Sequence, residues 1–221
     1  MSESDLRIEV DKGTAVSARR YLPQVASGTI LLYAPGAGSN IDDAFGVYLG
    51  RELARNGIET WLFQFPYMET RRRAPDRAPV LEATWNAAIA QARASGPKLL
   101  VIGGRSMGGR IASRVVAQGA PVDGLVLFAY PLVPPGRDGA ARAEHLPDIA
   151  VPTLFCSGTR DSFGTPDQLL DASKLVTNSR LHLLDGADHG FATLKSSGRS
   201  RGDVFAEATA AALGFIRELA R

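Results

Sequence analysis

The sequence is short of cysteine, histidine, net charge and long apolar runs, and each shortage excludes a class of protein. Among its 221 residues there is one cysteine, Cys156, so no disulfide can form within the chain. Cys156 stands inside an apolar segment, which predicts a buried, inert thiol rather than a nucleophile. The three histidines stand in no cluster with metal-ligand spacing, and no phosphate loop or dinucleotide fingerprint is present. The sequence therefore predicts no metal and no cofactor.

Charge and hydrophobicity exclude further classes. The formal net charge of +2 is too small to indicate a nucleic-acid partner or an acidic membrane surface. No apolar run approaches the length that spans a bilayer, and residues 1–5 are acidic and polar, unlike a signal peptide. With 45% hydrophobic and 22% charged residues, the composition is that of a soluble globular protein. We expect a cytoplasmic protein in which residues 1–221 form a single domain.

What the sequence does contain is a series of short apolar runs that alternate with amphipathic segments. The alternation predicts a doubly wound α/β domain, in which helices cover both faces of a mostly parallel sheet. The first two strands, 6–10 and 16–22, are expected to form a hairpin at one edge. The other expected strands are 29–34, 60–65, 99–102, 124–129, 153–158 and 181–184, and the expected helices are 43–56, 80–95, 110–117, 167–176 and 203–221.

The most informative stretch is LLVIGGRSMGGRIASRVVA, residues 99–117. A buried strand leads into a G-x-S-x-G motif centred on Ser106, and a helix follows. A serine in such a turn is lifted above the sheet, and its glycine neighbours let strand and helix approach closely. The N-terminus of the helix offers free N–H groups to a developing oxyanion. Because the chain has 23 glycines, the alternative is a glycine-rich turn that merely packs.

Two more chemical groups follow strands at the same expected edge of the sheet. Asp161 comes after strand 153–158 and His189 after strand 181–184. The carboxyl ends of parallel strands meet at one edge, and the order Ser, Asp, His is that of α/β-hydrolases. We expect His189 to take the proton of Ser106 and Asp161 to orient the imidazole.

The remaining parts of the expected site are backbone groups and neighbouring acids and histidines. The N–H groups of Met107 and Ala37 are the expected oxyanion hole. The rival residues have structural interpretations: Asp188 braces the loop of His189, His182 faces away within its strand, and His145 fixes a loop. Asp185 and Asp123 are the weaker candidates for the acid. Asp185 is close to His189 in sequence, and Asp123 precedes a strand rather than following one.

Four arginines, Arg71, Arg72, Arg73 and Arg77, follow the strand 60–65 on the catalytic side. One interpretation is a solvated charged loop. The other is that one guanidinium binds a substrate carboxylate through its planar fork. Both stay open, whereas Arg105, beside the serine, is expected to make structural bonds.

Taken together, the motifs PGAGSN, GGRSMGGR, SGTRDSFGTP and DGADHGF resemble those of the α/β-hydrolase superfamily, from Ile30 onward. The stretch EHLPDIAVPTLFCSGTRDSFGTP, together with GADHGF, further resembles a small branch near dienelactone hydrolases. Relatives of that branch include a subunit of the animal NSL histone-acetyltransferase complex. The resemblance implies an eight-stranded, mostly parallel sheet with a minimal cap. It also implies that Ser106, Asp161 and His189 match the catalytic triad of the family.

The chain departs from the family pattern at two positions. Dienelactone hydrolases proper have a cysteine nucleophile where this chain has Ser106, so their substrate does not carry over. Pro35 stands where many relatives have a histidine. Only residues 131–147 could form a lid, which predicts an open site.

These features predict a serine hydrolase that acts through an acyl-enzyme, a carboxylesterase for small acyl esters or lactones. The expected partner is a small-molecule acyl substrate, with no nucleic acid and no membrane, and the protein is expected to be a monomer or weak homodimer. A thioesterase or peptidase with the same triad is an alternative, since specificity lies in loops. A non-catalytic interaction domain of the same fold is another.

Overall fold

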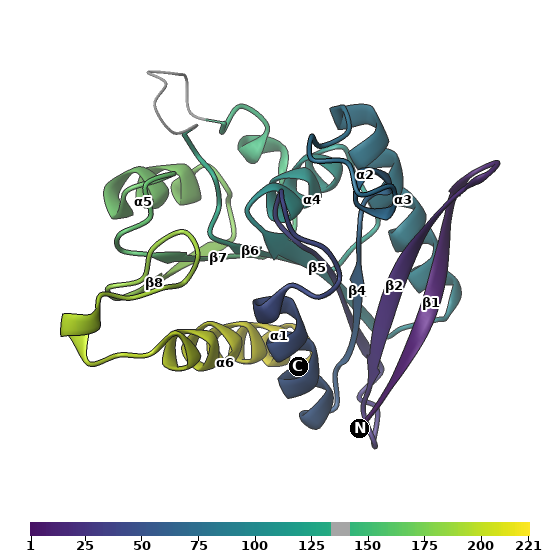
Figure 1. The fold of residues 1–221 in the computed structure, drawn as a ribbon, viewed down its shortest axis with the longest axis horizontal. Coiled ribbons are helices and arrows are strands. Elements are labelled where there is room, and N and C mark those ends of the chain that lie inside the picture. The colour runs from purple at the N-terminus through teal and green to yellow at the C-terminus, as the bar shows by residue number, and fades with distance from the viewer. Residues whose placement is uncertain (134–141) are drawn as a thin grey trace.

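The computed structural model describes residues 1–133 and 142–221. Its centre is an eight-stranded sheet with the order β1-β2-β4-β3-β5-β6-β7-β8 (Figure 1). The β1/β2 and β2/β4 pairs are antiparallel, and every other pair is parallel. The strands are β1 (Ser2–Asp11), β2 (Thr14–Leu22), β3 (Thr29–Ala34), β4 (Glu59–Phe63), β5 (Leu99–Arg105), β6 (Gly124–Phe128), β7 (Thr153–Gly158) and β8 (Ser179–Leu184).

Helices cover both faces of this sheet, which confirms the predicted fold class. In Figure 1, α1 and α6 lie together on one side and α2, α3, α4 and α5 on the other. Two short 3₁₀ turns complete the described structure, at Leu146–Asp148 and Lys195–Ser197. The helices are α1 (Ala44–Arg55), α2 (Pro66–Glu69), α3 (Ala78–Ala94), α4 (Met107–Ala117), α5 (Pro166–Lys174) and α6 (Arg201–Leu219).

Several predicted boundaries are wrong, and two of these errors lie on either side of Ser106. Strand β5 continues past residue 102 to Arg105, because its ladder with β6 extends to the pair Arg105 and Phe128. Helix α4 begins at Met107 rather than at residue 110. The segment after β4, where no helix was predicted, contains the short helix α2. Within 131–147, the only stretch that could have formed a lid, a 3₁₀ turn begins at Leu146, and residues 134–141 lie outside the described part.

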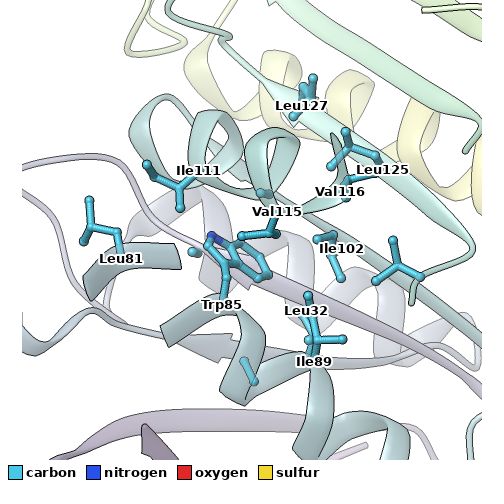
Figure 2. Packing of buried hydrophobic residues seen from close by; sticks show 14 of the residues in the cluster. Leu32, Leu81, Trp85, Ile89, Ile102, Ile111, Val115, Val116, Leu125 and Leu127 are labelled. Atoms are coloured by element: carbon cyan, nitrogen blue, oxygen red, sulfur yellow. The ribbon is translucent and has the colours of Figure 1, made fainter. Parts of the chain in front are cut away.

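The core on the α3/α4 side is organised around Trp85, which is completely buried. Strand residues such as Leu32 and Ile102 face this ring, and Ile111 and Val115 of α4 pack beside it (Figure 2). The indole Nε1–H donates a hydrogen bond of 3.2 Å to the carbonyl of Gly108, in the first turn of α4. Since a buried indole needs a partner for its N–H, this bond fixes the helix that follows Ser106. No helix within the described residues is long and apolar enough to cross a membrane.

Candidate active site

Ser106 occupies a strained turn between β5 and α4. Its φ of 51° and ψ of −118° lie outside the conformations that a non-glycine residue ordinarily adopts. The backbone around it holds the turn in place: the Ser106 N–H donates to the carbonyl of Phe128 at 2.8 Å, and the Ser106 carbonyl accepts from the N–H of Arg110 at 2.9 Å. The serine side chain is therefore presented at the end of β5 rather than within the sheet.

Glycines allow the chain to pass close on either side of this turn. A Cβ at Gly108 would overlap with the carbonyl oxygen of Ala34 and lie 2.6 Å from that of Pro35. A Cβ at Gly104 would likewise overlap with the Ala34 carbonyl and lie 2.8 Å from the Gly109 nitrogen. All of these neighbours are backbone atoms at the end of β3 and in α4. The motif glycines are thus required by close approach, as the sequence predicted.

Gly108→Ala is expected to lower the free energy of unfolding by about 3 kcal/mol, because the added methyl group meets backbone that has little room to move. Gly214→Ala, in α6, is the matched control: its Cβ would have nothing within 4 Å. It should raise stability by up to about 1 kcal/mol, as glycine in a helix interior is unfavourable relative to alanine. Urea denaturation of both variants measures the difference. Equal midpoints for Gly108→Ala and the wild type would contradict the close-approach argument.

His189 links the serine to a buried carboxylate. Its Nε2 lies 2.9 Å from Ser106 Oγ, and its Nδ1 lies 2.8 Å from Asp161 Oδ2. The Asp161 side chain is completely buried, at the end of β7, whereas the imidazole is 23% exposed, in the loop after β8. The three predicted residues come from three strand ends, and the structure brings them together in one continuous chain of hydrogen-bond distances.

Two neighbouring residues, Phe163 and Asp188, hold His189 and its loop, and the sequence indicated only Asp188. The ring of Phe163 stacks on the imidazole with centroids 4.0 Å apart, and the Phe163 N–H donates to Asp161 Oδ1 at 2.8 Å. Phe163 was not singled out by the sequence analysis. Asp188 accepts hydrogen bonds from the N–H groups of Gly190 and Ala192, at 2.8 and 2.9 Å. This is the bracing role that the sequence predicted.

The rival histidines and acids have other partners. His182 Nε2 lies 2.8 Å from Glu207 on α6, and His145 Nε2 lies 2.7 Å from the Ser113 hydroxyl. Asp123 pairs with an arginine of α3 and accepts the N–H of Leu100. Each of these side chains joins secondary-structure elements, which agrees with their structural interpretation.

Arg105 also has a structural partner. Its guanidinium pairs at 3.3 Å with Asp43, a nearly fully buried carboxylate. Asp43 in turn accepts the hydroxyl of Tyr33 at 2.8 Å and caps α1 through the N–H of Gly46 at 2.9 Å. The residue before the serine is therefore tied to the first turn of α1, as expected.

The loop after β3 lies against the serine on the opposite side from the histidine. A Cβ at Gly36 would be 3.4 Å from the Ser106 Cβ, so the loop passes in contact with the turn. Ala37 and Met107, the expected oxyanion-hole residues, line the same pocket as Ser106. Met107 is the first residue of α4, where backbone N–H groups have no partner within the helix. Their role as oxyanion donors stays a prediction.

That pocket has a volume of about 340 Å³ and carries two arginines that the sequence analysis missed, Arg110 and Arg142. Arg110 had a sequence signal, because it follows Ser106 by four residues on one helix face. The four predicted arginines lie elsewhere: all are exposed, and Arg72 pairs with Asp76. Because none of these four arginines is among the described residues that line the pocket, their interpretation as a solvated charged loop is favoured.

Other reactive groups are absent from the site or inert. Cys156 is completely buried in β7, and burial raises the pKa of its thiol far above the ordinary value, so the thiolate does not form near neutral pH. Across residues 1–133 and 142–221, no group of His, Cys, Asp and Glu has the arrangement of a metal site.

Comparison with known families identifies the family of the chain. A family model described as an alpha/beta hydrolase domain matches residues 27–217. The chain belongs to the α/β-hydrolase family. The match covers most of the chain, which agrees with the order of strands in the sheet.

Solved structures of other α/β-hydrolases have the same fold at low identity. The dienelactone hydrolase of Anabaena variabilis is 19% identical, with a TM-score of 0.76, over 98% of this chain and 97% of that one. An α/β serine hydrolase homologue from Coxiella burnetii is 17% identical, with a TM-score of 0.77, over 99% and 98%. A serine hydrolase without a lid from Xanthomonas campestris is 18% identical, with a TM-score of 0.74, over 98% and 94%. These likenesses concern the fold, and they agree with the resemblance to the dienelactone hydrolase branch.

Proposed function

We propose that this α/β-hydrolase is a serine hydrolase that cleaves small carboxylic esters or lactones through an acyl-enzyme. The observation that carries the proposal is the chain of short distances from Ser106 Oγ through His189 to buried Asp161. A serine hydroxyl is a weak nucleophile until a base removes its proton, and a neutral imidazole does this near neutral pH. Asp161, acceptor-only when ionised, selects the tautomer with the proton on Nδ1, which leaves Nε2 free to act as that base.

The proposed reaction has two matching halves. Ser106 Oγ attacks the ester carbonyl while its proton passes to His189 Nε2, and the carbonyl oxygen becomes an oxyanion. The imidazolium then gives this proton to the departing alkoxide as the C–O bond breaks, which leaves an acyl-serine and a free alcohol. Water, deprotonated by His189, attacks the acyl-serine, and the proton returns to Ser106 Oγ as the acid is released. Asp161 stabilises the imidazolium in both halves without taking its proton.

The oxyanion is proposed to accept hydrogen bonds from the N–H groups of Met107 and Ala37. Both residues line the pocket beside Ser106, one at the start of α4 and one in the loop after β3. A helix N-terminus adds partial positive charge where the negative charge develops.

Labelling with a fluorophosphonate probe, followed by peptide mass mapping, tests the nucleophile and the base together. The probe is expected to modify Ser106 in the wild type and to leave His189→Ala unmodified, since the hydroxyl is not activated without its base. Assays with matched ester, thioester and amide substrates then establish which acyl bond is cleaved. An unmodified Ser106 in correctly folded wild-type protein would contradict the proposal.

A further inference from the structure

The two arginines in the pocket wall differ from the other half-buried arginines of the molecule. Arg93, Arg105 and Arg114 each pair with a carboxylate, on Asp123, Asp43 and Glu82 respectively. Arg110 and Arg142 form no ion pair with any carboxylate of residues 1–133 and 142–221, and the buried Nε of Arg110 has no hydrogen-bond partner there. A buried guanidinium nitrogen without an acceptor is costly, and an arriving acceptor would remove that cost.

Arg110 is positioned to act on a group bound to the serine. It lies one helical turn beyond Ser106, about 6 Å along the axis by the rise of an α-helix. Ser106 and Arg110 line the same pocket. The first charged neighbour of the Arg110 guanidinium is Arg142, which lines this pocket as well.

Arg142 is fixed beside it by its backbone. The Arg142 N–H donates to the carbonyl of Leu132 at 2.8 Å, and the Arg142 carbonyl accepts the hydroxyl of Tyr130 at 2.8 Å. Tyr130 is completely buried, and burial raises its pKa to about 12, so its hydroxyl keeps the proton that it donates. These two hydrogen bonds hold the backbone of Arg142, whose side chain lines the pocket with Arg110.

The charges around the pocket favour an anion. Arg110 has Arg142 and Arg114 as cationic neighbours, with Glu144 exposed nearby, and burial together with the charge of Arg142 lowers the pKa of Arg110. Asp76, the one acidic residue among the described residues of the wall, is paired with Arg72 and also accepts the N–H of Tyr67 at 2.8 Å. Two neighbouring guanidinium groups repel each other, and a shared carboxylate would remove that repulsion.

This pocket is assigned to the acyl group of the substrate rather than to its leaving group. The leaving group must stay near His189 Nε2 to receive its proton. Ala37 and Met107 line this pocket with Ser106, and so does Phe163, which stacks on the His189 imidazole. From Ser106 the pocket extends past Arg110 and Ile111 of α4, and the acyl group is proposed to lie there.

We propose that Arg110 and Arg142 bind an ionised carboxylate on the acyl group of the substrate, so that the preferred substrates are half-esters of short dicarboxylic acids. This inference rests on the proposed serine-hydrolase function and specifies its substrate class. The carboxylate would sit a few carbon atoms from the scissile carbonyl, in keeping with one helical turn between Ser106 and Arg110.

Two esters that differ only in this charge test the proposal: 4-nitrophenyl hydrogen adipate and its neutral methyl ester. We expect wild-type kcat/KM to favour the anionic ester roughly 10- to 100-fold, the range for a hydrogen-bonded charged group. Arg110→Gln should abolish most of this preference while hydrolysis of the neutral ester continues. Arg110→Lys should retain part of it, since lysine keeps the charge but not the planar fork.

Arg73→Gln is the matched control, because it removes one positive charge from an exposed arginine on the same side of the sheet. Its preference ratio should equal that of the wild type. Equal kcat/KM for the two esters in the wild type, or an unchanged ratio in Arg110→Gln, would overturn the inference. The proposed hydrolase function would still stand if both activities disappeared in Ser106→Ala.

A binding measurement separates the inference from turnover altogether. In Ser106→Ala, titration calorimetry with monomethyl adipate and dimethyl adipate should show tighter binding of the anion. The difference should fall in the double variant with Arg110→Gln. If the wild type hydrolyses no ester but this difference is found, the carboxylate site stands and the proposed reaction fails. If no difference is found, the carboxylate site is wrong.

Discussion

Ser106→Ala is expected to lower kcat for a short activated ester by about 10⁴- to 10⁶-fold, because no other group can form the acyl-enzyme. Residual rate above that of water would come from binding and from the backbone donors at Met107 and Ala37. Steady-state and single-turnover hydrolysis of 4-nitrophenyl acetate measure the loss. The burst of nitrophenolate that marks acyl-enzyme formation should disappear completely.

The folding of this variant must be unchanged for the result to concern chemistry. Ser106 is half-buried, and alanine removes its hydroxyl while keeping its Cβ, so the thermal midpoint should stay close to that of the wild type. Ser197→Ala, which removes an exposed hydroxyl far along the chain, serves as the matched control and should retain full activity. A Ser106→Ala protein that hydrolyses several short esters at the wild-type rate would exclude the proposed nucleophile.

Asp161→Asn is the second large effect, with kcat expected to fall by about 10⁴-fold. The amide is similar in size to the carboxylate and can still accept the N–H of Phe163. However, it no longer stabilises an imidazolium, and its NH₂ group favours the wrong tautomer of His189. KM should change little, because Asp161 is buried behind the imidazole and does not reach the substrate.

Asp185→Asn makes the same chemical change at an exposed carboxylate four residues before His189. It should leave kcat within about twofold of the wild type, as surface charges contribute little at this exposure. The double variant Ser106→Ala and Asp161→Asn should be no slower than Ser106→Ala alone, since the three residues act as a unit. An Asp161→Asn variant that retains most of its kcat would show that another group orients His189.

Much of the site could be predicted because a parallel sheet imposes it. The carboxyl ends of β5, β7 and β8 lie at one edge, so residues that follow these strands converge whatever their separation in sequence. Ser106 and His189 are 83 positions apart, and their side chains still meet at 2.9 Å. The glycine requirement around Ser106 was also visible, because the motif itself expresses the close approach of strand and helix.

The boundaries near Ser106 could not be predicted from local preferences. Gly103 and Gly104 are poor strand formers, yet the ladder with β6 continues through them to Arg105. Gly108 and Gly109 are poor helix formers, yet they lie in the first turn of α4. Glycine is required at both positions because a side chain there would collide with neighbouring backbone. In both cases tertiary packing overrides propensity.

The arginine pair lay beyond sequence reasoning for a different reason. Arg110 and Arg142 are far apart in the chain, and only the fold brings both of them to the pocket. Arg142 donates its N–H to the carbonyl of Leu132, and its carbonyl accepts the buried hydroxyl of Tyr130; neither residue forms a recognisable motif with Arg142. The run of arginines at 71–77 was conspicuous in sequence, but its members are exposed.

The buried indole of Trp85 gives the molecule a built-in optical probe. Of its two tryptophans, Trp61 lies on β4 under the guanidinium of Arg20, whereas Trp85 donates to Gly108 in the helix turn that follows the nucleophile. In Trp61→Phe protein, the remaining fluorescence therefore arises from a chromophore that is hydrogen-bonded to that turn. Its emission in stopped-flow mixing would report directly on any movement of α4 as the serine is acylated and released.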